Sequence, residues 1–161
     1  IDGIDGLAMS EVIKTILLIE FFSAGDTALS PLALLLVVSM IPLYYFNFRK
    51  NHKVFLGDGG SLLIGTIISI YVFYILGNDF EFKSGFAINK ALFAVLVLLY
   101  PLVDLLRVFV IRIKNGNSPF QPDQNHIHHL TLNYFKKHFP TLIAILSMEV
   151  IILLITKFLI N

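Results

Sequence analysis

The sequence predicts an all-α protein, a polytopic membrane bundle of about five transmembrane helices. Hydrophobic residues make up 57% of the 161 residues and charged residues only 14%, whereas a soluble domain carries about 25% charged residues. The mean hydropathy is +0.81, and the apolar residues fall into long stretches that polar segments separate. Because so much apolar surface requires lipid around it, we expect residues 1–161 to belong to a single integral-membrane domain.

The first apolar stretch covers residues 7–24 and is the weakest of the set, because it carries Glu11, Lys14 and Glu20. Glu11 and Lys14 have the spacing of neighbours on one helix face. Since charges are costly in lipid, this face is expected to look into the bundle. The other expected spans are residues 31–48, 61–77, 86–113 and 140–160.

The fourth stretch, residues 86–113, is longer than the ~20 residues that a bilayer requires. We therefore expect it to leave the bilayer near Asp104 and to kink at Pro101. Asp104 and Arg107 are spaced to pair with each other on this helix. Residues 130–138 are expected to form a short amphipathic helix.

Five spans place three polar segments, residues 1–6, 49–60 and 112–139, on one side of the membrane. Most of the lysines and arginines lie in or beside these segments, which makes that side cytoplasmic by the positive-inside rule. Net charge is +1, and the chain has no cysteine, which excludes a disulfide framework and a thiolate metal site. No feature suggests nucleic-acid binding. The sequence begins at Ile1 without a signal-peptide pattern, and we expect it to be the C-terminal part of a longer protein.

A single carboxylate, Asp58, lies among three glycines on the second polar segment. A basic patch, residues 49–53, precedes it, and a helix expected to begin near Ser61 follows it. Glycines let backbone N–H groups approach a ligand closely, and the helix would aim its positive end at the same place. This stretch suits a phosphate and a hard cation together, although an ordinary acid in a loop is an alternative.

The other two polar segments carry further polar side chains. Asp2 and Asp5 form a repeated Asp-Gly pair, which is also a common turn sequence. The histidines are His126, His128 and His129, which suit neutralisation of phosphate charge; zinc binding or a solvated loop are the alternatives. Carboxylates are ligands that Mg²⁺ accepts together with substrate phosphates, and phosphoryl transfer requires mainly positioning and electrostatic stabilisation.

Three motifs together resemble the polyprenyl-phosphate N-acetylhexosamine-1-phosphate transferases. They are IDGIDGLA at residues 1–8, FLGDGGS at 55–61 and PDQNHIHHL at 122–130. The resemblance covers essentially the whole chain in order, spacing and sidedness. It implies transfer of a sugar 1-phosphate, as the first membrane step of cell-envelope polysaccharide synthesis, from a UDP-sugar to undecaprenyl phosphate with release of UMP.

The resemblance also implies roles for particular residues. Asp58 is expected to bind Mg²⁺, with Mn²⁺ as a substitute, and Asp2 and Asp5 to form the second acidic motif. The histidine motif, His126, His128 and His129, is expected to handle the diphosphate. Gly3, Asp5 and Phe55 are expected to lie near the uracil ring, and Asn47 near the nucleotide. Arg112 and Asp123 are expected to support the histidine loop. The alternative role of Phe55 is that of an aromatic anchor at the membrane interface.

The family's first motif, a pair of adjacent aspartates, is absent from this sequence, and we expect the 161 residues alone to be inactive. The HIHH form favours UDP-N-acetylglucosamine as donor. The resemblance further implies a multi-pass protein of the bacterial inner membrane with a cytoplasmic active site, and we also consider a homodimer. The alternatives are a phospho-N-acetylmuramoyl-pentapeptide transferase of peptidoglycan synthesis and a non-enzymatic membrane cation carrier.

Overall fold

The computed structural model describes residues 4–49, 51–86, 88–120 and 126–160, and the statements below concern these residues. They form seven helices, which confirms the all-α class. In chain order the helices are α1 (Leu7–Phe22), α2 (Ser30–Asn47), α3 (Gly57–Leu76), α4 (Lys90–Val97), α5 (Leu99–Lys114), α6 (Ile127–Phe135) and α7 (His138–Ile160).

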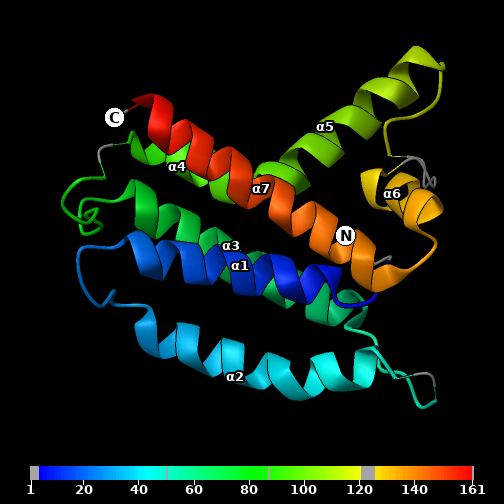
Figure 1. Cartoon of the computed structure of the whole chain (residues 1–161), viewed down its shortest axis with the longest axis horizontal. Coiled ribbons are helices and arrows are strands. Elements are labelled where there is room, and N and C mark those ends of the chain that lie inside the picture. The colour runs from blue at the N-terminus through cyan, green and yellow to red at the C-terminus, as the bar shows by residue number, and fades with distance from the viewer. Residues whose placement is uncertain (1–3, 50, 87, 121–125, 161) are drawn as a thin grey trace.

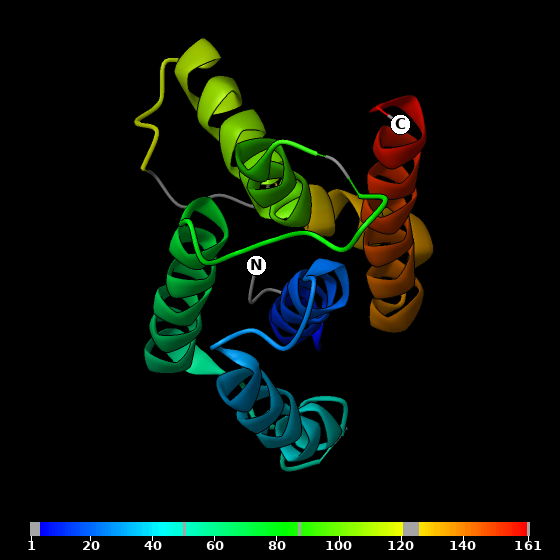
Figure 2. The same ribbon diagram turned by 90° about the vertical axis from the view of Figure 1, so that its left-hand side faces the viewer.

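Helix α1 lies at the centre of the bundle. It packs against α2, α3, α4 and α7, and the end-on view shows these helices around it (Figure 2). Ile16 and Ile19 of α1 are fully buried, whereas Leu17 and Phe21 are exposed, so most of the helix surface is covered by protein. This position explains how its charged residues are tolerated.

Three helices, α2, α3 and α7, are long and apolar enough to cross a membrane, and the bent pair α4 and α5 is a fourth candidate. Large apolar side chains such as Leu34, Leu62 and Phe158 are exposed on the outside of the bundle, as lipid contact requires. The structure thus confirms a helical membrane bundle. The first predicted span, residues 7–24, is not among these candidates, because its helix α1 has only 16 residues.

The predicted kink occurs at Leu98 and not at Pro101, where we expected it. Helices α4 and α5 meet there at an angle of 74°, as Figure 1 shows where α5 turns away from the bundle. A proline ring clashes with the carbonyl group four residues earlier and supplies no N–H for it. Pro101 therefore breaks the helix at Val97, one turn before the proline itself.

Two helix starts also differ from the predictions. Helix α3 begins at Gly57, so Asp58 lies in its first turn and not in a loop before Ser61. A carboxylate is favourable there because the first N–H groups of a helix carry partial positive charge. Helix α6 begins at Ile127, three residues before the predicted amphipathic helix, and therefore includes His128 and His129.

A buried ionic cluster joins α1 to α7. The ammonium group of Lys14 lies 2.6 Å from Glu11 Oε2 and 2.7 Å from Glu149 Oε2, and all three side chains are almost inaccessible. The predicted pairing of Glu11 with Lys14 is confirmed. The second carboxylate, from α7, could not be assigned from spacing because it lies 135 residues further along the chain.

Replacement of Lys14 by Met is expected to destabilise the protein by about 3–5 kcal/mol, because it leaves two buried carboxylates without their cation. The exposed Lys114 gives a matched control, whose replacement by Met should change stability by about 0.5 kcal/mol or less. Equilibrium unfolding in mixed micelles measures both. Equal effects of the two substitutions would contradict the buried cluster.

Candidate active site

The polar segments predicted to share one side of the membrane do meet at one end of the bundle. This is the end where α1 and α7 begin and α2 ends (Figure 1). The carboxylate of Asp5 lies 2.5 Å from Lys53 Nζ and 3.4 Å from His138 Nδ1. Asp5 thus contacts the basic patch before α3 and the first residue of α7, and it joins three segments that are far apart in the sequence.

Asn47, the last residue of α2, ties the first two motifs together. Its Oδ1 accepts a hydrogen bond of 2.7 Å from the Gly6 backbone N–H, and its Nδ2 donates one of 2.8 Å to the Val54 carbonyl. The side chain is buried and uses both ends of its amide. Asn47 therefore fixes the Asp-Gly repeat and the loop before Asp58 relative to each other.

Phe55 and Asp58 lie open to solvent beside this connection. The Phe55 ring is 59% exposed, and Lys53 Nζ lies 5.2 Å from its centroid. The exposed Asp58 carboxylate lies in the first turn of α3. An aromatic face, an ammonium group and an acid at a helix N-terminus are thus available together to a ligand from solution.

The histidine motif is held by an aspartate of α5. His126 Nδ1 lies 2.7 Å from Asp104 Oδ2, and the Ile127 backbone N–H donates a hydrogen bond of 2.6 Å to Asp104 Oδ1. Asp104 is buried, and its carboxylate satisfies one of the free N–H groups at the start of α6. A single side chain of α5 therefore orients both the first histidine and the helix that carries the others.

His128 is buried and lies against the ring hydroxyl of Tyr100, which is 3.1 Å from its Nδ1. Burial lowers the pKa of His128 to about 4, and the neighbouring His129 acts in the same direction. His128 is therefore neutral at physiological pH and packs as a polar part of the interior. Of the three predicted histidines, His126 and His129 are half-buried and thus more accessible.

The side chains of Asp104, His126 and His128 offer three ligand atoms within 4.8 Å of one another. The zinc site considered from the sequence consisted of His126, His128 and His129. In the structure Asp104 takes the place of His129 in this set. Carboxylate and imidazole groups suit zinc. The direct contact between Asp104 and His126 nevertheless accounts for their approach without an ion.

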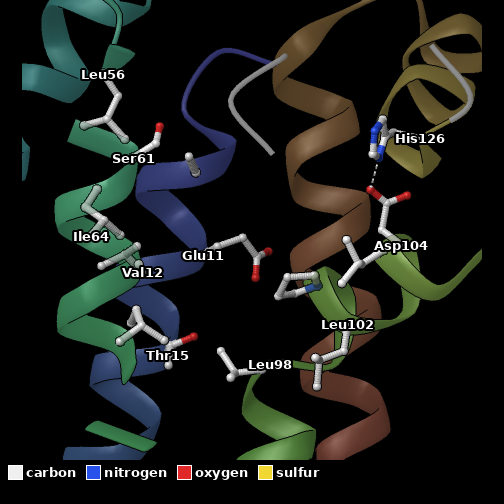
Figure 3. Close-up of a pocket in the computed structure, with 15 residues that line it drawn as sticks. Glu11, Val12, Thr15, Leu56, Ser61, Ile64, Leu98, Leu102, Asp104 and His126 are labelled. Carbon is white, nitrogen blue, oxygen red and sulfur yellow. Dashed lines mark hydrogen bonds and ion pairs between the residues drawn. The ribbon is translucent and has the colours of Figure 1, made fainter. Parts of the chain in front are cut away.

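A cavity of about 540 Å³ opens beside Asp104 and His126. Figure 3 shows Asp104 and His126 on one side of it and α1 and α3 on the other. Its wall is mostly apolar, with Leu98 and Leu102 from α4–α5 and Ile64 from α3. Glu11 also faces it, and Glu11 Oε1 has no hydrogen-bond partner among the described residues. The cavity suits an apolar ligand that reaches a polar group at Asp104 and His126.

Some of the predicted site residues lie outside the described residues. These are Asp2, Gly3 and Asp123. Arg112, expected to support the histidine loop, donates a hydrogen bond of 2.5 Å to the Pro119 carbonyl. It therefore holds the beginning of the connection between α5 and α6.

Sequence reasoning did not assign Asp104, Tyr100 or His138 to the site. An acid inside an apolar run was the available signal for Asp104, because ionisable residues at membrane depth are usually functional. Spacing suggested Arg107 as the neighbour of Asp104, whereas the structure shows contacts with α6. Tyr100 and His138 carry no pattern that separates them from ordinary packing residues.

These features define a class: a helical membrane protein with a polar, partly basic site at one end of the bundle, beside an apolar cavity. The profile of glycosyl transferase family 4 matches residues 1–76 of this chain. The matched region contains the Asp-Gly repeat and the Asp58 motif. The family resemblance seen in the three motifs is thereby confirmed.

Curated relatives extend the similarity to most of the chain. It is 33% identical over 153 residues to a decaprenyl-phosphate N-acetylglucosaminephosphotransferase of Mycobacterium leprae, which covers 86% of this chain and 38% of the relative. It is 34% and 31% identical, over 138 residues each, to the undecaprenyl-phosphate alpha-N-acetylglucosaminyl 1-phosphate transferases of Yersinia pestis and Escherichia coli K12, which covers 82% of this chain and 36% of each relative. The chain thus spans less than two-fifths of these relatives. No solved structure matches it.

Two glycines allow a test of the contact between the Asp-Gly repeat and α2. Gly6 and Gly57 both have left-handed backbones, with φ of +75° and +68°, but only at Gly6 would a Cβ atom collide, 2.5 Å from Phe48 Cε2. The left-handed conformation costs an L-residue about 1–2 kcal/mol, and the collision adds ~1–3 kcal/mol. Unfolding in mixed micelles should therefore show Gly6→Ala to be more destabilising than Gly57→Ala. The reverse order would contradict the packing of Gly6 on Phe48.

The lowered pKa of His128 predicts a pH dependence of stability. The unfolded chain binds a proton at this residue below its ordinary pKa of 6.5, whereas the folded protein does so only near pH 4. The stabilisation is thus complete above pH 6.5 and is lost as the pH falls toward about 4. The unfolding free energy of the native protein should decrease more over this range than that of His128→Gln. Equal decreases would show that His128 is accessible to protons in the folded state.

Proposed function

We propose that the protein containing this chain transfers N-acetylglucosamine 1-phosphate from UDP-N-acetylglucosamine to a polyprenyl phosphate such as undecaprenyl phosphate, with release of UMP. The names of the relatives support the sugar and the polyprenyl acceptor. The observation that carries the proposal is that residues of all three motifs, Ala8, Ser61 and His126, line one cavity.

The nucleotide sugar is proposed to bind around Asp5, Phe55 and Lys53. The exposed Phe55 ring offers a face on which a uracil ring stacks, and Lys53, beside it, offers a positive charge to the diphosphate. Asn47 keeps the two segments at a constant spacing through its bonds to Gly6 and Val54. These contacts bind and orient the donor without taking part in bond breaking.

Asp58 is proposed as a ligand of Mg²⁺. The ion prefers hard oxygen ligands and keeps water and substrate phosphates beside one or two carboxylates. The exposed carboxylate of Asp58 fits, and at Gly57 and Gly59 no atom lies within 4 Å of the place a Cβ would take, which leaves room for phosphate oxygens. When bound, the ion would neutralise charge on the transferred phosphate. Helix α3 adds its positive N-terminal end.

His126 is proposed to hold a hydrogen bond or a proton at a phosphate oxygen. The Asp104 carboxylate accepts a hydrogen bond from His126 Nδ1 or forms an ion pair with it. This contact orients the ring and leaves Nε2 for the substrate. The cavity beside it is proposed to accommodate the first prenyl units of the acceptor, because its wall is largely apolar. The lipid phosphate would then lie near His126 and the donor phosphate.

The polar end of the bundle is proposed to face the cytoplasm of a bacterium, with the helices in the inner membrane. The positive-inside rule supports this side, since Lys53, Arg112 and Lys114 lie at or beyond it. A water-soluble donor and a lipid-borne acceptor can meet only at such a surface.

The test uses the full-length protein in membranes, with undecaprenyl phosphate and radiolabelled UDP-N-acetylglucosamine. Asp58→Asn and His126→Ala should each lower kcat by about 100-fold or more, because each removes electrostatic stabilisation of the transferred phosphate. Asp79→Asn, an exposed acid at the opposite end, is the matched control and should retain activity. Chelation of divalent ions should stop the reaction, and added Mg²⁺ should restore it.

Two other outcomes would replace the proposal. A lipid-linked product formed only from UDP-N-acetylmuramoyl-pentapeptide would identify the peptidoglycan-precursor reaction. Divalent-ion uptake that survives Asp58→Asn, in the absence of any lipid-linked product, would identify a carrier.

A further inference from the structure

The helix break at Leu98 leaves backbone groups without partners inside an apolar bundle. In a continuous helix the Val97 carbonyl would accept a hydrogen bond from residue 101, but Pro101 has no N–H. On the other side of the break, the Tyr100 N–H has lost its own intrahelical acceptor. Unsatisfied backbone groups are costly at membrane depth, so both must be bonded by other parts of the chain.

The two neighbouring helices supply these partners. Thr15 of α1 donates a hydrogen bond of 3.2 Å to the Val97 carbonyl, and Glu149 Oε1 of α7 accepts one of 3.0 Å from the Tyr100 N–H. Both bonds are buried. Lys14 holds the other oxygen of Glu149 at 2.7 Å, so the carboxylate that caps α5 is itself held from α1.

The residue capped by Glu149 is also the first residue of α5 that reaches the histidine motif. The Tyr100 hydroxyl lies 3.1 Å from His128 Nδ1, and Asp104, one turn later on the same face of α5, binds His126 and the Ile127 N–H. A shift of the start of α5 would therefore move both contacts to α6 together.

We propose that Glu149, anchored by Lys14, is a positioning residue: by capping α5 at the break it sets the direction in which Asp104 and Tyr100 hold the histidines of α6. Its effect on catalysis rests on the proposed function, whereas its effect on the docking of α6 does not. Glu149 acts through α5 and does not touch the substrate.

The docking of α6 is measured first, in the full-length protein carrying Ile127→Cys, at a half-buried position whose N–H is bonded to Asp104. Native cysteines elsewhere in the protein, if present, are replaced by Ser. Glu149→Leu removes the acceptor and should raise the rate at which a water-soluble maleimide labels the introduced thiol by about 10-fold or more, as local opening becomes more frequent. Glu149→Gln retains an oxygen for the Tyr100 N–H and should stay within about 3-fold of the parent protein, because loss of the backbone bond is avoided.

Glu20 provides the matched control. It lies on α1 and accepts two hydrogen bonds, from Thr27 and Ser30, but at the opposite end of the bundle. Glu20→Leu should lower stability without changing the labelling of the thiol on α6. Thr15→Val, which removes only the bond to Val97, is the second variant should Glu149→Leu fail to accumulate, and it should raise labelling in the same direction.

Kinetics with native Ile127 then test the consequence. Glu149→Leu should lower kcat by about 100-fold, as expected for misplaced catalytic groups, with KM for the nucleotide sugar within about 3-fold, because the donor contacts lie on other segments. Glu149→Gln should restore most of kcat. Unchanged labelling in both Glu149→Leu and Thr15→Val, or equal disruption by Gln and Leu at position 149, overturns the positioning role. A parent protein that lacks transferase activity but shows the expected labelling overturns only the proposed function.

Discussion

The constraint on which the structure depends is that every backbone N–H and C=O group inside an apolar bundle requires a partner. Pro101 makes this impossible within one helix, and the chain responds with a sharp break between α4 and α5. The partners that the break requires come from α1 and α7, through Thr15 and Glu149. Buried polar contacts from α1 and α7 therefore lie at the break.

The break determines the place of the candidate site. Because α5 leaves the bundle at a steep angle (Figure 1), Tyr100 and Asp104 can reach α6, which lies at the end of the bundle where α1 begins and α2 ends. One half of the site comes from α1, α2 and α3 and their connections and carries Asn47, Phe55 and Asp58. The other half comes from α5, α6 and α7 and carries the histidines, and Asp5 joins the two halves through His138.

Much of this organisation could be predicted from the sequence. The apolar stretches predicted the helices, and the distribution of Lys and Arg predicted that the three motifs share one end. The predictions that differ from the structure do so for separate physical reasons. Pro101 was correctly identified as a disruption, but its effect falls one turn earlier, and the start of α3 moved to Gly57 because a glycine with positive φ turns the chain directly into the helix. The spacing of Asp104 and Arg107 suggested a local pair, whereas the aspartate contacts α6.

The sequence by itself determined the class of the protein, its helical stretches and the residue types available for phosphate chemistry, because hydrophobicity and motif spacing are local properties of the chain. Only the tertiary structure decided which of those residues meet. The partners of Asp104, Lys14 and Glu149 lie between 22 and 135 residues away, apart from the neighbouring Glu11. Contacts over such separations depend on how the helices cross. The crossing follows from the packing of their buried faces and from the requirement of hydrogen-bond partners for the backbone groups at the helix break.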